Sequence, residues 1–136
     1  MECVGTTIFV DNVEEVLDFY YQAFGIPTAY IDEQGTYGEL DCGQGVIAFA
    51  AHAISQPHFR QGYIRCHPKQ PTLGFELSFE CDNVAQSFAK ALEAGAEPLS
   101  PPTQHEGQFV AFLRAQEGTL IRLFSNKQSA SPEKVF

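Results

Sequence analysis

Lysine and arginine are missing from the first 59 residues of this chain. The same segment holds nine of the 17 acidic residues, so the formal net charge of −9 arises entirely before Arg60; the remainder carries eight acids and eight bases. A surface of this sign repels phosphate groups. We therefore expect no nucleic-acid partner and no membrane partner, whereas cationic or neutral small molecules remain candidates. Net negative charge also keeps a domain in solution, which is its commoner role.

Other absences narrow the class of protein further. No apolar run reaches the roughly 18 residues that a membrane-spanning helix needs, and the N-terminus lacks the basic and apolar segments of a secretory signal. The four cysteines are widely spaced and form no C-x-x-C pair, which favours thiols over a disulfide framework. Tryptophan is absent, but 12 phenylalanines and a hydrophobic fraction of 44% indicate a globular domain. We expect a cytoplasmic protein.

One unit occurs twice in the chain. Asp11-Asn12-Val13 is repeated as Asp82-Asn83-Val84, each after an apolar strand-like run and before an amphipathic pattern that ends at Gly25 or Gly95. Asparagine is a typical helix N-cap and glycine a typical stop, so each copy predicts a strand followed by a helix. Further strands are expected at 28–32, 37–41 and 46–51 in the first copy and at 97–99, 108–114 and 119–125 in the second.

The predicted fold class is α+β, built from two βαβββ modules. A helix covers only one face of a four-stranded sheet, so we expect the modules to pair into a cupped mixed sheet with the helices on the outer face. The expected divisions are a first module at 1–52, a connector over the cavity mouth at 53–72, a second module at 73–125 and a polar tail at 126–136.

The duplicated units and the segment Ile8–Gly25 together resemble a known superfamily. From Asn12 this segment reads Asn-Val-x5-Phe-Tyr-x3-Phe-Gly, and residues 118–123 read Gly-Thr-Leu-Ile-Arg-Leu. Both are similar to the vicinal oxygen chelate superfamily, which includes glyoxalase I, extradiol dioxygenases, fosfomycin-resistance enzymes and bleomycin-resistance proteins. The resemblance covers about residues 4–125 and implies the duplicated βαβββ fold.

Enzymes of this superfamily usually hold a divalent metal with one side chain from the first strand and one from the last strand of each half. The resemblance places these positions at Gly5 and Glu76 in the first strands, and at Ala48 or Phe49 and Arg122 in the last strands. Of these, only Glu76 offers a metal donor, and Arg122 would repel a cation. We therefore expect that the protein binds no metal and no cofactor. Within the superfamily, the resemblance is then closest to the metal-free bleomycin-resistance branch. We also expect Glu76 and Arg122 to form an ion pair.

Strand alternation assigns side chains to the two faces of each sheet. Ile8, Val10, Ile121 and Leu123 are expected under the helices, together with Phe75, Leu77 and Phe79. The opposite residues would line the cavity, and the connector, which crosses the cavity mouth in relatives, would supply its rim. The histidines match no zinc pattern. The predicted ligand-binding residues are Thr7, Phe9, Phe59, Arg60, Tyr63, Glu76, Ser78, Glu80, Arg122 and Phe124.

Two classes of function fit this resemblance. The first is a metal-free binding protein that sequesters a cationic or aromatic, drug-like ligand in a cavity at a homodimer interface; we assign it no catalytic residue. The alternative is a lyase, isomerase or dioxygenase-like enzyme of the same superfamily with a non-standard or absent metal site. There, Glu76 or Glu80 would act as a general base whose pKa is raised by an apolar pocket.

Overall fold

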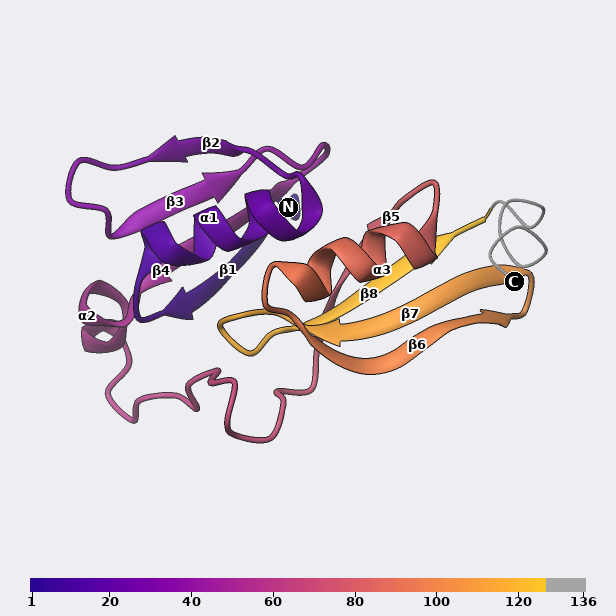
Figure 1. Ribbon diagram of the computed structural model, residues 1–136. Coiled ribbons are helices and arrows are strands. Elements are labelled where there is room, and N and C mark those ends of the chain that lie inside the picture. Colours follow the sequence, from indigo (N-terminus) through magenta and orange to yellow (C-terminus); the bar gives the residue numbers. More distant parts are fainter. Residues whose placement is uncertain (127–136) are drawn as a thin grey trace. The chain divides into compact units, whose positions relative to one another are not determined.

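The computed structural model describes residues 1–126, which form two compact units, one spanning Met1–Cys66 and the other beginning at His67. Each unit contains a four-stranded mixed sheet and one long helix in βαβββ order (Figure 1). The predicted α+β class and the two βαβββ modules are confirmed. Of the predicted polar tail, all but Asn126 lies outside the described residues.

The first module contains β1 (Gly5–Val10), α1 (Val13–Phe24), β2 (Thr28–Ile31), β3 (Tyr37–Leu40) and β4 (Val46–Ala51). The strand order is β1-β4-β3-β2, with β1 parallel to β4 and the other pairs antiparallel. A short helix, α2 (His52–Ser55), and a 3₁₀ turn, η1 (Gln56–His58), follow β4 directly. The helix α1 lies across one face of the sheet (Figure 1).

The ends of α1 form as its sequence predicts. The Asn12 side chain accepts a hydrogen bond of 3.0 Å from the Glu15 amide, and Gly25 ends the helix with a φ of 69°, which glycine adopts without strain. The buried side of α1 packs on β4, where the Tyr20 and Phe49 rings lie 5.0 Å apart and both side chains are fully buried. This contact is the centre of the first core.

The second module contains β5 (Glu76–Glu80), α3 (Val84–Glu93), β6 (Glu97–His105), β7 (Gln108–Arg114) and β8 (Leu120–Ser125). Its strand order, β5-β8-β7-β6, repeats that of the first module. Asn83 caps α3 by accepting a hydrogen bond of 3.0 Å from the Gln86 amide. The core between α3 and the sheet includes Ala91, Leu113 and Ile121, all completely buried.

Strand β6 is longer than the sequence predicted, since the expected strand ended at Leu99 and the observed one continues to His105. Pro101 and Pro102 are tolerated because β6 is an edge strand, and because the register shifts between Ser100 and Thr103. Glu106 and Gly107, with φ values of 49° and 83°, form the two-residue turn into β7.

The predicted alternation of faces holds in β1, β5 and β8. Ile8, Val10, Leu77, Ile121 and Leu123 are buried, whereas their neighbours along each strand are partly or fully exposed. The prediction for Phe75 was wrong: it precedes β5 and is 39% exposed, because the strand begins one residue later. In residues 1–126, no helix has the length and apolar character that would let it cross a membrane.

Candidate functional site

The sheet face opposite α1 carries two rows of side chains in the first module. Cross-strand register places Thr7, Ala48 and Glu39 in one row. The same register places Phe9, Ala50 and Tyr37 in the next. Thr7 and Phe9 were predicted on this face. Tyr37 and Glu39 were missed, although the alternation of β3 would have placed them there once Gly38 was assigned to the helix side.

Tyr37 and Glu39 form a polar pair on this face. The Tyr37 hydroxyl donates a hydrogen bond of 2.7 Å to Glu39 Oε2. That bond, together with burial, raises the pKa of Tyr37 to about 12. The hydroxyl therefore stays protonated at physiological pH and is a hydrogen-bond donor, not a base.

Three aromatic rings gather beside β1, at the end of the same face. The Phe9 ring lies 4.9 Å from Tyr63 and 5.8 Å from Phe59, and the Phe59 and Tyr63 rings meet edge to face at 5.7 Å. All three were predicted as ligand-binding residues. The structure brings them together because the chain turns back over β1 after η1.

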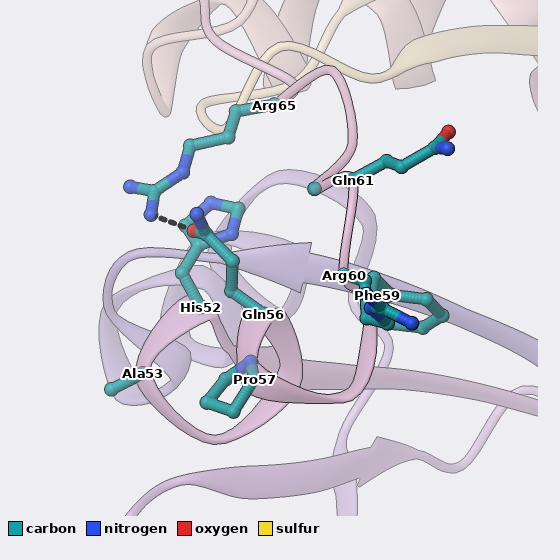
Figure 2. Close-up of a pocket in the computed structure, with 9 residues that line it drawn as sticks. His52, Ala53, Gln56, Pro57, Phe59, Arg60, Gln61 and Arg65 are labelled. Atoms are coloured by element: carbon teal, nitrogen blue, oxygen red, sulfur yellow. Dashed lines mark hydrogen bonds between the residues drawn. The ribbon is translucent and has the colours of Figure 1, made fainter.

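An open hollow of about 700 Å³ lies next to this aromatic cluster (Figure 2). Its walls come from α2, η1 and the segment that follows them. Figure 2 shows Arg65 extending from that segment to the Gln56 side chain, with which it forms a hydrogen bond. The lining residues are His52, Ala53, Gln56, Pro57, Phe59, Arg60, Gln61, Gly62 and Arg65.

The imidazole of His52 is the most buried polar group of the hollow, only 6% exposed. Its Nε2 lies 3.8 Å from Asp11 Oδ1, which favours the tautomer with the proton on Nε2. Nδ1 then accepts the 2.6 Å hydrogen bond that the Tyr63 hydroxyl donates. Sequence reasoning missed His52 as a site residue because its partners lie at distant positions in the chain.

The pH dependence of folding should report this buried imidazole. Burial, reinforced by Arg65, lowers the pKa of His52, and Asp11 opposes the shift only in part. The unfolded chain then binds more protons, so this contribution to stability is complete above about pH 6.5 and decreases as the pH falls towards the lowered value. Urea unfolding at pH 5.5 and 7.5 should therefore show a smaller pH effect for His52→Gln than for the unmodified chain. The control is His58→Gln, which removes an exposed imidazole from η1; equal effects of the two variants would contradict the assignment.

The sheet face opposite α3 carries the predicted residues of the second module. Glu76, Ser78 and Glu80 alternate along β5, with Ser78 beside Arg122 and Glu80 beside Phe124 of β8. Arg122 lies over the Phe124 ring, with its guanidinium carbon 4.6 Å from the ring centroid. All five therefore share one face, as strand alternation predicted.

A chain of hydrogen bonds links Arg122 to Glu80 across this face. Arg122 donates to Gln108 Oε1 at 2.6 Å, and the Gln108 amide donates to Asn126 at 2.8 Å. The Asn126 amide in turn lies 3.4 Å from Glu80 Oε2. Gln108 and Asn126 were not predicted site residues, since neither matches a position of the resemblance.

The predicted ion pair between Glu76 and Arg122 was wrong. Among the described residues no ion pair joins them: Arg122 bonds to Gln108, and Glu76 accepts a 2.9 Å hydrogen bond from Ser78. The register explains this, because Arg122 stands beside Ser78 while Glu76 stands beside Leu120. Glu76 and Glu80 are also exposed on the surface of the second unit.

The amino-acid sequence matches the model of one protein family. The model of the Glyoxalase/Bleomycin resistance protein/Dioxygenase superfamily matches residues 4–123, nearly the whole chain. The chain belongs to this superfamily. No match was found among the curated proteins.

Solved structures of this superfamily share the fold at low sequence identity. A glyoxalase-related enzyme from Fulvimarina pelagi is 15% identical with a TM-score of 0.76, over 93% of this chain and 88% of the other. A glyoxalase/bleomycin resistance protein/dioxygenase family enzyme from Burkholderia phytofirmans PsJN is 22% identical with a TM-score of 0.72, over 92% and 98%. A glyoxalase/bleomycin resistance protein/dioxygenase from Nocardioides is 12% identical with a TM-score of 0.71, over 97% and 87%.

The register now resolves which residue of β4 occupies the superfamily's usual ligand position. Thr7 stands beside Ala48 just as Ser78 stands beside Arg122, and Phe49 faces α1. The position is therefore Ala48. The four positions at which the resemblance leads us to expect metal ligands are therefore Gly5, Ala48, Glu76 and Arg122. One of them has a donor side chain and one is a cation, so these side chains do not fit a divalent metal ion. Within residues 1–126, no three His, Cys, Asp or Glu side chains are grouped so that they could hold a metal.

The backbone of β4 also closes the Gly5 position to any larger residue. A Cβ atom at Gly5 would collide with the Val46 carbonyl oxygen and lie 2.9 Å from Val46 Cβ. Any larger side chain at position 5 would thus require β4 to move.

Proposed function

We propose that this protein binds an aromatic, drug-like small molecule without a divalent metal and sequesters it unchanged, as bleomycin-resistance-type proteins do. One observation carries the proposal: three of the four usual metal positions, Gly5, Ala48 and Arg122, have no donor side chain. Binding a ligand without transforming it requires no metal ion, which agrees with this set of side chains.

The proposed ligand contacts lie on the sheet faces opposite the helices and beside the hollow. Exposed aromatic groups with a few polar neighbours are typical of small-molecule sites. Carboxylates on the second face would accept a cationic group of the ligand. The proposed contacts are Thr7, Phe9, Phe59, Arg60, Tyr63, Glu76, Ser78, Glu80, Arg122 and Phe124, with the segment 53–72 as a connector over the cavity mouth.

We further infer a cytoplasmic homodimer in which the cavity lies at the subunit interface. All four cysteines are thiols and not disulfides, which agrees with a reducing compartment. The formal charge of −9 argues against nucleic acid and anionic membranes as partners. In gel filtration the protein should elute at twice its chain mass of 15.0 kDa.

The metal content of the purified protein tests the proposal most directly. We expect less than about 0.1 equivalent of Fe, Mn, Ni and Zn per chain, and no change in melting temperature on adding each ion, because a bound metal would stabilise the folded state. About one equivalent of any of these ions would overturn the metal-free assignment.

A thermal-shift screen of the same preparation tests ligand binding. Aromatic cations, anions and neutral compounds should include binders that raise the melting temperature, since a ligand selective for the folded state stabilises it. Phe59→Ala should weaken such binding, whereas Tyr21→Ala, which removes an exposed ring from α1, should not. A broad screen without any binder would refute sequestration.

A further inference from the structure

The only two basic residues of the first unit line the same hollow. Residues 1–66 contain nine acids but only Arg60 and Arg65 as bases, a formal net charge of −7. Both arginines line the hollow beside α2, and none of its lining residues is acidic. The hollow is therefore a positively charged spot on an otherwise acidic module.

Arg60 and Arg65 differ in how they are held. Arg65 donates a hydrogen bond to Gln56 Oε1, and its Nη1 lies 3.8 Å from Asp11 Oδ1. Half of the Arg65 side chain is exposed. Arg60 is exposed and makes no ion pair or hydrogen bond with the described residues 1–126. One guanidinium is thus positioned by its neighbours, while the other still has its hydrogen-bonding capacity available.

Neutral polar and apolar groups complete the walls. The His52 imidazole, whose pKa burial lowers, is uncharged at neutral pH and adds no cation. Phe59 is 45% exposed and, together with Pro57, gives the hollow an apolar surface against which a flat ring could pack. The hollow thus presents two guanidinium groups and one aromatic ring face to a ligand.

We propose that this hollow binds the carboxylate of an aromatic acid, with Arg60 and Arg65 on the carboxylate and Phe59 against the ring. The inference rests on the proposed binding function and names the group that the first module recognises. Guanidinium forks match the planar carboxylate in geometry and hydrogen-bond number. Asp11 cancels one of the two positive charges, so a single negative charge is neutralised, while a phosphate dianion would leave an excess in a module that is already acidic.

Four small probes that share a phenyl ring separate the possible ligands. The full chain at pH 7.5 is titrated with sodium benzoate, benzamide, benzylammonium and phenyl phosphate, and amide chemical shifts are followed by NMR. Benzoate should shift amides within 52–65 and bind about tenfold more tightly than benzamide, since hydrogen bonds to charged groups are the stronger ones. Phenyl phosphate should bind more weakly than benzoate.

Matched variants test the residues. Arg60→Gln, which breaks no contact among the described residues, should weaken benzoate binding about tenfold, and Arg65→Gln should do the same. Lys90→Gln removes an exposed cation from α3 and should leave the affinity within about twofold. Equal effects of Arg60→Gln and Lys90→Gln, or tighter binding of phenyl phosphate, would overturn the carboxylate assignment.

The probes also distinguish failure of this inference from failure of the proposed function. If benzylammonium or another aromatic cation binds while benzoate does not, the carboxylate assignment is wrong and small-molecule binding stands. If no probe and no compound of the thermal-shift screen binds, both are wrong.

Discussion

Replacing Phe49 with alanine should lower the free energy of unfolding by about 3–5 kcal/mol, the usual cost of truncating a buried aromatic ring. Phe49 is completely buried, and its ring packs 5.0 Å from that of Tyr20. The cavity left behind would lie between α1 and β4, at the centre of the first core. Urea unfolding followed by circular dichroism measures this change.

Phe75→Ala is the matched control, because it removes the same atoms from a side chain that is 39% exposed. Its cost should stay below about 1 kcal/mol. The comparison also tests the site, since the burial of Phe49 under α1 is what assigns Ala48 to the usual metal position. Equal costs for the two variants would contradict that register.

Replacing Arg114 with alanine should be the second most damaging change, with a loss of about 2–4 kcal/mol in the free energy of unfolding. Arg114 is only 7% exposed, and its guanidinium donates to the carbonyls of Gly118 at 3.0 Å and His67 at 2.7 Å. Arg114 therefore connects the first residue of the second unit to the turn between β7 and β8 through hydrogen bonds. Removing the donor leaves both carbonyls without these hydrogen bonds.

Arg60→Ala controls for the loss of a positive charge, because Arg60 is exposed and should change stability by no more than about 0.5 kcal/mol in the absence of ligand. Arg114→Lys keeps the charge but loses the forked geometry, and should fall between the two. Denaturant unfolding of the three variants measures their free energies of unfolding. If Arg114→Ala lowers the free energy of unfolding no more than Arg60→Ala does, Arg114 does not have this anchoring role.

The fold was predictable where local signals agreed with tertiary packing. Asn12 and Asn83 cap helices in both modules, and the apolar alternation identified the buried side of each sheet. The end of β6 was not predictable from local signals, because the same prolines that usually end a strand are tolerated on an edge. Which edge a strand occupies depends on the order of the whole sheet.

The candidate site was predictable only in part, because its contacts join distant segments. Thr7, Phe9 and Arg122 follow from strand alternation. The two partners of His52 come from the loop after β1 and from the segment after η1, and no short sequence motif predicts such contacts. The expected Glu76–Arg122 pair failed for a related reason: a registry offset of two residues decides which side chains meet, and Gln108 on the neighbouring strand is within reach of Arg122.

The prolines of β6 also bear on aggregation. An exposed strand edge is a template on which another chain can add a strand, and proline provides no N–H group for that pairing. Pro98, Pro101 and Pro102 therefore make the outer edge of the second sheet a poor template, and the bulge between Ser100 and Thr103 makes it irregular. Pro101 and Pro102, which lie in the part of β6 that sequence-based prediction missed, thus also help to protect this edge from self-association.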